Sequence, residues 1–462
     1  MIIEINTHET ITGFLRRNGR ALTGDCGKHA GCGKCRVKLL SGVWKSSGRV
    51  VGAPATAVAC VTRLESSTGS FEIPDGNAEE AQISGEWFHT RPLPVTPEPV
   101  IALDAGTTTL AAVRIENGIV TGRAGSFNGQ YCCGDNIITR IARSEKEFPL
   151  LRRLLLDSME ALLKQLDFTS AARIGIGGNT VMNCFLHGIL PLSIGSYPFQ
   201  APQTFFPERS DLWGGVNVIT LPSLTGLLGG DITGALFESP PEEGEMLIDL
   251  GTNCEILFRH GECIYGTSAA AGPAFEGAGI SAGSRAVTGA IDHWYSPKDL
   301  SVIGGGRASS VCGSALVDFL ASARSSGVLS EFGRLTSGKS SFELAPGVAV
   351  SENDIAELLK AKAAVASAVR ALERYCGTKV KKMKLAGGFS RWLNPESAKK
   401  CGLLPDVEIK ICGNLSLAAA ARAALTPEIT GSMAALQKNI RELHLNEIPG
   451  YEELFMRSLR LP

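Results

Sequence analysis

The sequence lacks the features that would place the protein in a membrane or on a nucleic acid. No uncharged apolar stretch reaches the ~18 residues that a transmembrane helix needs, and charges interrupt the N-terminal residues "MIIEINTHETITGFLRRNG", unlike those of a signal peptide. The formal net charge is −1, with 45 basic and 46 acidic residues, so no excess of positive charge attracts a polyanion. We therefore expect a cytoplasmic protein that binds neither nucleic acid nor membrane.

Histidine is scarce as well. The seven histidines include no H-x-x-x-H pair, which is the arrangement that lets two imidazoles on one helix face hold a catalytic zinc ion. Hydrophobic residues make up 44% and charged residues 20% of the chain, as in an ordinary globular protein. At 462 residues the chain is too long for a single hydrophobic core, so we expect two or three domains.

Cysteine, in contrast, is abundant. An odd total of 13 cysteines spread over the chain does not suggest a disulfide framework, and a reducing compartment would oppose one. Nine of them are dispersed, mostly within apolar or small-residue runs, which is typical of buried thiols. The other four are Cys26, Cys32, Cys35 and Cys60.

These four cysteines follow a metal-ligand pattern. The first three have the spacing C-x5-C-x2-C, and the fourth follows after 24 further residues. A [2Fe–2S] cluster needs four thiolates, and the glycines of "GDCGKHAGCGKC" let the backbone wrap closely around it. Zinc is the main rival, although zinc ribbons usually pair two C-x-x-C knuckles and one is present here; plain structural thiols are the third interpretation. The pattern resembles ferredoxins of the [2Fe–2S] type over residues 1–75.

The organisation of the chain favours an α+β protein with a duplicated part. Residues 1–75 contain short alternating segments, which predict a β-grasp-like domain, and residues 76–98 are polar and then proline-rich, which favours an extended linker. Over residues 99–425 strands alternate with helices, and a strand–D-x-G-T–strand unit occurs twice, 145 residues apart. This repeat predicts a two-lobed duplicated α/β body, with residues 426–462 as a tail packed on it.

The repeated unit also predicts a nucleotide site. Asp104 and Asp249 each end an apolar strand, and two carboxylates facing a cleft can hold Mg²⁺ directly or through water. Glycine turns with threonine hydroxyls and free amides can cradle phosphate oxygens, and "LAGGFS" allows close approach to an adenosine. The expected ATP-binding residues are Gly106, Thr107, Thr108, Thr109, Gly251, Thr252, Asn253, Gly387 and Gly388. This set resembles the superfamily of acetate kinase, sugar kinases, actin and the heat-shock chaperone ATPases.

Several longer stretches narrow the resemblance, namely "GDNIITRI", "GGNTVMN", "SAAAGPAFEGAGISAGSRAVTGAI", "CGSALVD", "GNLSLAAAA" and the tail "ELHLNEIPGYEELFMRSLRLP". Together with the N-terminal cysteine pattern they resemble the reductive activators of corrinoid proteins. The resemblance implies an ATPase-coupled electron transferase of anaerobic methyl metabolism. Such a protein passes one electron from its [2Fe–2S] cluster to a Co(II) corrinoid and regenerates Co(I) for methyl transfer.

The resemblance also implies cofactors and partners. The cofactors are the [2Fe–2S] cluster, ATP and Mg²⁺, and the partners are a corrinoid protein and a low-potential electron donor such as a ferredoxin, flavodoxin or reductase. Ser268, Phe275 and Glu276 are expected to approach the corrinoid or the γ-phosphate, although close packing between the lobes explains their segment equally well. Longer family members carry an extra small domain where this chain has some 25 residues. Their mode of dimerisation therefore does not carry over, and a homodimer stays an open expectation.

Three other functions remain open at this stage. The chain could activate another low-potential enzyme such as a dehydratase, whose activators resemble it less because they hold a [4Fe–4S] cluster between subunits. It could be a small-molecule kinase with a redox-sensing domain, although no dedicated substrate-pocket motif is found. A non-catalytic electron carrier or ATP-dependent scaffold is the third possibility.

Overall fold

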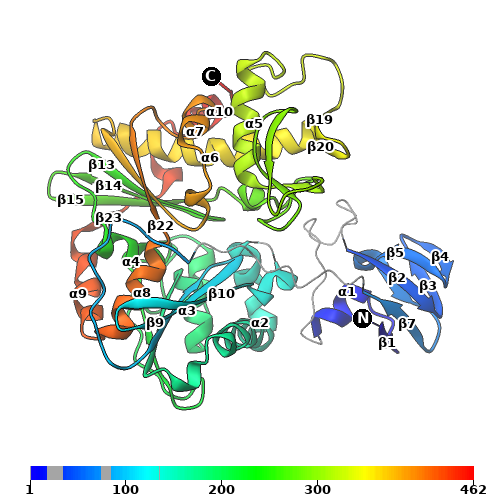
Figure 1. Ribbon diagram of the computed structural model, residues 1–462, viewed down its shortest axis with the longest axis horizontal. Helices are drawn as coiled ribbons and strands as arrows, with labels where there is room; N and C mark the ends of the chain where they lie inside the picture. The colour runs from blue at the N-terminus through cyan, green and yellow to red at the C-terminus, as the bar shows by residue number, and fades with distance from the viewer. Residues whose placement is uncertain (1, 18–34, 74–84, 135) are drawn as a thin grey trace.

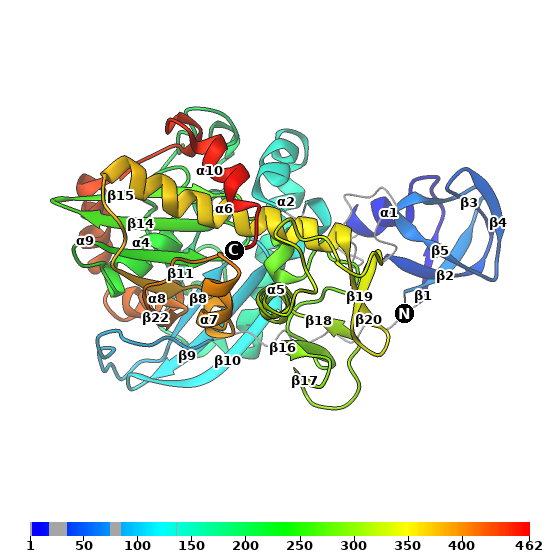
Figure 2. The same ribbon diagram turned by 90° about the horizontal axis from the view of Figure 1, so that it is seen from above.

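The computed structural model describes residues 2–17, 35–73, 85–134 and 136–462 (Figure 1). The N-terminal strands lie at one end of the long axis, beside a larger two-lobed body (Figures 1 and 2). Within the described ranges, no helix combines the length and the apolar character needed to cross a membrane.

The N-terminal part contains two small sheets and one helix. One sheet has the order β1-β7-β2-β5, with all neighbouring strands antiparallel, and the other has the order β4-β3-β6. Val37 and Leu39 alternate with exposed residues along β2 and pack in one core with Ile11 and Leu15 of the helix. The elements are β1 (Ile2–Ile5), α1 (Ile11–Arg17), β2 (Arg36–Ser41), β3 (Val43–Ser46), β4 (Arg49–Gly52), β5 (Ala55–Val58), β6 (Thr62–Leu64) and β7 (Gly69–Glu72).

The two lobes are built on sheets with the same order of strands. Lobe I has the order β10-β9-β8-β11-β12, and lobe II has β15-β14-β13-β21-β22 with β23 beside β15. In both sheets the first three strands are antiparallel neighbours and the last two join in parallel. This shared topology confirms the predicted two-lobed duplication.

The strands and helices of the two lobes follow one another in chain order. Lobe I contains β8 (Val100–Ala105), β9 (Thr109–Glu116), β10 (Ile119–Phe127), α2 (Ile137–Gln165), β11 (Arg173–Gly178), α3 (Thr180–His187) and β12 (Asn217–Thr220). Lobe II contains β13 (Glu245–Leu250), β14 (Cys254–His260), β15 (Cys263–Ala269), α6 (Glu352–Cys376), β21 (Lys382–Ala386), α7 (Pro395–Lys400) and β22 (Glu408–Gly413).

Lobe II also carries an insertion and the C-terminal segment. The insertion contains β16 (Ala290–Ser296), β17 (Asp299–Val302), β18 (Ser310–Val311), α5 (Gly313–Ser325), β19 (Ser341–Ala345) and β20 (Val348–Ser351). The C-terminal segment contains α9 (Ile429–Ala435), β23 (Ile440–Glu442) and α10 (Tyr451–Ser458). Strand β23 pairs in parallel with β15, and Leu454 of α10 packs against Ala371 of α6.

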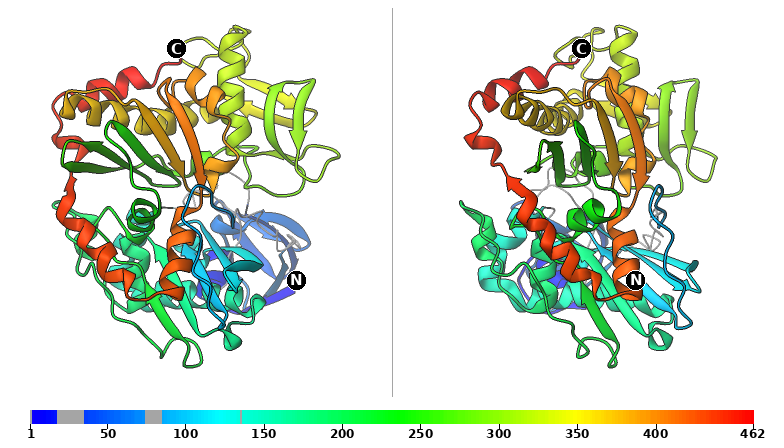
Figure 3. Two further views of the ribbon diagram at one scale, coloured as in Figure 1. Left: turned by 60° about the vertical axis from the view of Figure 1, so that its left-hand side comes forward. Right: turned by 90° about the vertical axis from the view of Figure 1, so that its left-hand side faces the viewer.

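The lobes exchange one helix each. Helix α4 (Gly230–Glu238) follows β12 of lobe I, yet its Ile232 packs with Leu247 of the lobe II sheet. Helix α8 (Leu415–Leu425) follows β22 of lobe II, yet its Leu417 packs with Val100 of the lobe I sheet. Figure 3 shows this exchange, with the orange α8 against the cyan strands of the other lobe. The two helices therefore join the lobes in both directions.

Small residues allow the exchanged helices to approach closely. A Cβ on Gly175 of β11 would lie 1.9 Å from the carbonyl oxygen of Ala420 in α8, and a Cβ on Gly234 of α4 would lie 2.6 Å from the Cβ of Ala419. The alanine run of α8 combines high helix propensity with a thin side-chain layer. The sequence "LSLAAAARAAL" is thus suited to a helix that is buried on all sides.

A buried ion pair closes the contact between α4 and α8. The Arg422 guanidinium donates to both carboxylate oxygens of Glu238, from Nε to Oε1 and from Nη2 to Oε2 at 3.0 Å, and the Glu238 side chain is completely buried. The same guanidinium donates to the carbonyl oxygens of Pro92 (3.1 Å) and Arg91 (2.8 Å). Arg422 therefore joins both helices to the chain that comes from the N-terminal domain.

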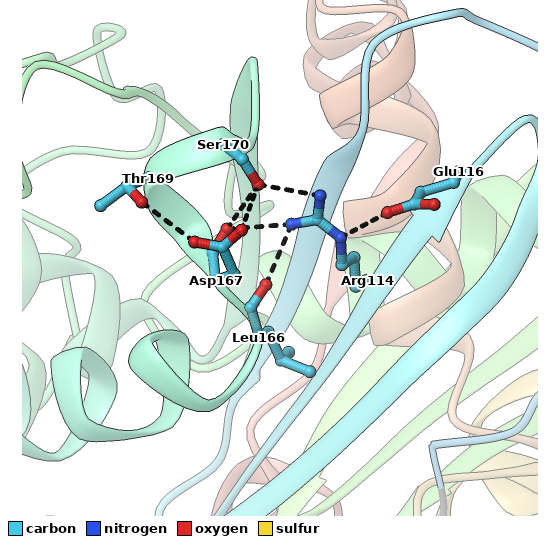
Figure 4. Close-up of polar contacts among 6 residues, drawn as sticks. All are labelled: Arg114, Glu116, Leu166, Asp167, Thr169 and Ser170. Carbon is cyan, nitrogen blue, oxygen red and sulfur yellow. Dashed lines mark hydrogen bonds and ion pairs between the residues drawn. The ribbon is translucent and has the colours of Figure 1, made fainter.

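A second arginine fixes the end of α2 to the lobe I sheet (Figure 4). Arg114 of β9 donates to the carbonyl oxygens of Leu166 (3.0 Å) and Asp167 (2.9 Å) and to Ser170 Oγ (2.9 Å). Its Nε donates to Glu116 at 2.6 Å. These bonds satisfy carbonyl groups that the end of a helix leaves without an intrahelical donor, and they hold α2 over the predicted strand–turn–strand unit.

We expect Arg422→Ala to destabilise the two-lobed body strongly. The substitution leaves the Glu238 carboxylate buried without its cation, a change that costs about 3–5 kcal/mol in comparable pairs. Chemical denaturation followed by tryptophan fluorescence measures the loss. Arg457→Ala is the matched control, because Arg457 pairs with Glu453 on the exposed face of α10 and such pairs contribute about 0–1 kcal/mol. Equal effects of the two substitutions would contradict the role given to the buried pair.

Candidate functional site

The two predicted acidic turns face each other across a cleft between the lobes. Thr108, in the turn after β8, and Thr252, in the turn after β13, place their hydroxyl oxygens 2.8 Å apart. The open space of the cleft amounts to about 1350 Å³, its solvent-filled mouth included. Its lining contains every residue predicted for the nucleotide site: Asp104, Gly106, Thr107, Thr108, Thr109, Asp249, Gly251, Thr252, Asn253, Gly387 and Gly388.

Asp104 is held by the start of the exchanged helix α8. Its Oδ1 accepts a hydrogen bond from Ser416 Oγ at 2.7 Å and its Oδ2 accepts one from Asn414 Nδ2 at 2.8 Å. Asn414 also caps the helix, since its Oδ1 accepts from the Leu417 amide at 2.8 Å. Burial raises the pKa of Asp104, and these two hydrogen bonds oppose that rise. Asp104 thus joins the first turn to a helix supplied by the other lobe.

Asp249 differs from Asp104 in its hydrogen bonding. Among the described residues, no hydrogen bond to its carboxylate is observed, and Gly387 packs so closely that a Cβ there would lie 2.4 Å from Asp249 Oδ1. Burial and the nearby charges of Asp231 and Asp104 raise the pKa of Asp249 well above its usual range. Of the two predicted aspartates, Asp249 therefore keeps its oxygens available to a ligand.

Asp231 and Glu255 also line the cleft and interact electrostatically with the predicted aspartates, although no sequence motif identified them as site residues. Asp231 stands in the first turn of α4, and burial together with the charge of Asp104 raises its pKa to about 7. Glu255 lies on β14, and burial and the charges of Asp231 and Asp249 raise its pKa well above the usual range. Asp231 could have been found from the sequence "GGD" before an apolar helix. Glu255 could have been found as the last residue of "IDLGTNCE".

A positively charged side chain, Arg285, lines the same cleft as these carboxylates. Arg285 is the single lysine or arginine among the described residues that line the cleft. Its guanidinium lies 4.0 Å from the ring centroid of Phe127 and 5.9 Å from that of Tyr131, both in lobe I. Cation–π contacts of this kind bridge the lobes and leave the guanidinium hydrogen-bond donors for an anion.

Glycines and aromatic rings form the remaining wall. Gly387 has φ +88°, a conformation that side chains rarely adopt, and it follows the end of β21. Phe389 and Phe275 stack with ring centroids 5.8 Å apart and an interplanar angle of 22°, and both line the cleft with Trp392. This apolar wall beside a glycine turn suits the flat base and the ribose of a nucleotide.

Of the three residues expected to face a corrinoid, Phe275 and Glu276 line the same cleft and Ser268 does not. Phe275 is only 3% exposed, and Glu276 accepts a hydrogen bond from Thr252 Oγ1 at 2.7 Å. Ser268 donates to Glu255 at 3.2 Å. These contacts favour roles toward the nucleotide turns over direct contact with a large partner.

One sequence match to a nucleotide motif lies elsewhere. Residues 333–340, "GRLTSGKS", have the spacing of a P-loop, but strand β19 follows them where a P-loop needs a helix. None of these residues lines the cleft, and most of them are exposed. The match therefore carries no nucleotide-binding role.

Two of the four predicted cluster cysteines are described, and Cys26 and Cys32 lie outside the described residues. Cys35 precedes β2 and Cys60 lies in the short turn Ala59–Val61; both are buried. The Ala59 amide donates to the Cys35 carbonyl oxygen at 2.8 Å, so the backbone brings the two cysteines to the same end of the sheet. Their placement fits a shared cluster site, and their thiols are soft ligands suited to iron.

Comparisons with protein-family models divide the chain into three parts. Residues 1–65 match the 2Fe-2S iron-sulfur cluster binding domain, residues 100–240 match the RACo middle region, and residues 243–462 match the C-terminal domain of RACo, the ASKHA domain. The first match supports the [2Fe–2S] interpretation of the cysteines over zinc. The third supports ATP binding in the cleft.

This chain is similar to two curated proteins and to a solved structure. The corrinoid activation enzyme RamQ of Eubacterium limosum is 26% identical over 78% of this chain and 69% of its own length. A [Co(II) methylated amine-specific corrinoid protein] reductase of Methanosarcina barkeri is 29% identical over 49% of this chain and 48% of its own length. A solved structure named reductive activator for corrinoid, iron-sulfur protein superposes with a TM-score of 0.73 at 23% identity, covering 98% of this chain and 95% of that one. The chain belongs to the RACo family, in which a 2Fe-2S domain precedes a two-lobed ASKHA-type ATPase.

Proposed function

We propose that the protein is an ATP-dependent reductive activator of a corrinoid protein. It passes one electron from its [2Fe–2S] cluster to a Co(II) corrinoid, which becomes Co(I), and it couples this step to ATP bound in the cleft. The observation that carries the proposal is the meeting of both predicted turns at the Thr108–Thr252 contact, in a chain that also carries a 2Fe-2S domain. The names of the two curated relatives support the corrinoid partner.

The turns would hold the phosphate groups of ATP. Thr107 and Thr108 come from lobe I and Thr252 from lobe II, so a bound phosphate chain would contact both lobes. Asn179 fixes the first turn, because its Nδ2 donates to Thr107 Oγ1 at 3.0 Å while its Oδ1 caps α3. Arg285 would offset phosphate charge from the lobe II side.

The carboxylates fit a magnesium ion that arrives with ATP. Asp104, Asp231, Asp249 and Glu255 concentrate negative charge in one cleft, and hard oxygen ligands are those that Mg²⁺ prefers. Asp249 and Asp231 would hold the ion directly or through water, while Asp104 keeps its hydrogen bonds to α8. A divalent cation there would offset the repulsion that raises the pKa values of this group.

Binding across the cleft would favour the closed arrangement of the lobes. A ligand shifts a conformational equilibrium only by its differential affinity for the two states, and ATP that touches both turns has such a difference. Closure would alter the surface offered to the corrinoid protein, and hydrolysis would release it. Slow turnover is expected, because the nucleotide drives a conformational step and no phosphate acceptor is needed.

The cluster would be held by Cys26, Cys32, Cys35 and Cys60 and would supply a one-electron carrier of low potential. The hydrogen bond from the Ala59 amide to the Cys35 carbonyl oxygen holds Cys35 beside the residue that precedes Cys60, which supports a shared site for the two thiols. A separate low-potential electron donor would reduce the cluster again after each turnover.

The central test measures cobalt reduction directly. Anaerobic holoprotein is mixed with a low-potential reductant and corrinoid methyl-transfer proteins in the Co(II) state, and the Co(I) absorbance is followed. We expect Co(I) to form with Mg-ATP and not with Mg-ADP or without nucleotide. Equal reduction in all three conditions would refute the coupling, and a phosphorylated small molecule as product would point to a kinase.

Asp249→Asn should separate nucleotide binding from cluster assembly. The loss of a charged magnesium ligand should weaken Mg-ATP binding by about 100-fold, measured by titration calorimetry, while the visible spectrum of the cluster stays unchanged. The thermal unfolding midpoint should not fall, because the substitution removes one of four mutually repelling charges. Asp299→Asn, on the exposed strand β17, is the matched control. A loss of both the cluster spectrum and ATP binding would show that Asp249 is structural.

The raised pKa of Asp231 predicts the pH dependence of stability. In the unfolded chain this carboxyl ionises near its ordinary value of about 3.9, whereas in the folded state it keeps its proton until pH about 7. Between these values the folded state binds more protons, so the free energy of unfolding falls as the pH rises. We expect the thermal midpoint of the nucleotide-free protein to fall from pH ~5 to pH ~7, and Asp231→Asn to reduce that fall. An identical slope in the variant would contradict the assignment.

A further inference from the structure

The second half of the predicted linker is attached to the nucleotide site. Residues 86–88 continue the lobe II sheet beyond β22, with Trp87 opposite Gly413 in an antiparallel bridge. The Phe88 amide donates to the Cys412 carbonyl oxygen at 2.8 Å, and the Asn414 amide donates to the Glu86 carbonyl oxygen at 2.9 Å. We call residues 86–88 the tether segment, because they connect the N-terminal domain to the lobes.

Gly413 is shaped for this attachment. Its φ is +70°, and a Cβ there would lie 2.5 Å from the Glu86 carbonyl oxygen and 3.2 Å from the Trp87 Cα. Its own carbonyl oxygen accepts a hydrogen bond from the Gly387 amide at 3.0 Å. Gly413 therefore contacts the tether segment on one side and the glycine wall of the cleft on the other.

Asn414 transmits the same contact to the first acidic turn. Its backbone amide is bound to Glu86, while its side chain caps α8 and donates to Asp104. All of these bonds involve Asn414, which is the N-cap residue of helix α8. A shift of the tether segment would therefore move the group that orients the Asp104 carboxylate.

A side-chain contact reinforces the backbone bonds. Glu86 pairs with Arg391, and the Arg391 guanidinium lies 5.2 Å from the ring centroid of Trp392 and 6.0 Å from that of Phe88. Trp392 lines the cleft. Because the ion pair is about one-third exposed on each side, its own contribution is modest, and the backbone bonds carry most of the attachment.

We propose that the tether segment is a positioning element of the nucleotide site, so that its docking and Mg-ATP binding strengthen each other. The proposal rests on the proposed function only in assuming that Mg-ATP binds in this cleft. Such coupling is reciprocal by thermodynamic linkage: if the docked segment raises the affinity for Mg-ATP, then Mg-ATP must hold the segment in place. The nucleotide would thereby control the chain that carries the cluster domain.

Hydrogen exchange in the full-length holoprotein tests the first half of this coupling. Mg-ATP should slow exchange of the Phe88 and Asn414 amides by about 5- to 10-fold, since both amides belong to the attachment. The exposed loop around Gly214, which is not part of the cleft lining, serves as an internal reference. Unchanged exchange at both amides under saturating Mg-ATP would overturn the proposal.

Charge exchange between Glu86 and Arg391 tests the second half. Glu86→Lys and Arg391→Glu should each weaken Mg-ATP binding by about 5-fold, and the double variant should recover most of the loss because the ion pair is restored in reverse. Glu98→Lys is the matched control, an exposed linker carboxylate for which no side-chain partner is observed in the described part of the chain. Recovery in the double variant is a readout that general loss of stability would not produce.

The outcomes separate this proposal from the function it rests on. If the unaltered protein fails to bind Mg-ATP, the proposed function fails first. If it binds Mg-ATP, but the tether variants bind equally well, or the double variant shows no recovery, the positioning role of the tether segment is refuted and the proposed function stands.

Discussion

The buried Arg422–Glu238 pair between α4 and α8 is the contact on which the remaining structure depends. Each helix leaves the sheet of one lobe and packs on the sheet of the other, and the ion pair fixes their mutual register. The first turn of α4 carries Asp231 into the cleft, and the start of α8 carries the two side chains that hold Asp104. The geometry of the site therefore depends on the exchanged helices as much as on the strands and turns that the sequence predicts.

The same construction brings together carboxylates that repel one another. Asp104, Asp231, Asp249 and Glu255 converge where burial weakens their hydration, and the described lining offers one arginine in return. Their raised pKa values express the free energy stored in that arrangement. The shifts predict that the free energy of unfolding falls as the pH rises toward neutral, and the proposed Mg-ATP complex would oppose that loss. A site of this kind favours ligand binding because its own charges are poorly matched without the ligand.

Attachment of the tether segment at Gly413 gives the linker a second role besides spacing. Its proline-rich composition predicts an extended chain, and the described residues 85–99 are mostly irregular. Composition could not show that three of these residues add to a sheet edge, because strand addition depends on backbone groups that every sequence has. The attachment brings the linker that leads from the 2Fe-2S domain to the N-terminus of the helix that orients Asp104.

The cysteine pattern, the duplicated strand–turn–strand units and their glycine- and threonine-containing turns could be predicted from the sequence, since each is a local arrangement of residues. Asp104 and Asp249 were identifiable because an acidic residue at the end of an apolar strand is a local signal. Asp231 and Glu255 were not identified, because their place in the site depends on which lobe α4 and β14 face. The folded structure was needed to show that Asp104 is bound by Asn414 and Ser416, some 310 residues away, while Asp249 keeps its oxygens for a ligand. That difference arises from the exchanged helices, whose partners lie far apart in sequence and meet only when both lobes are folded.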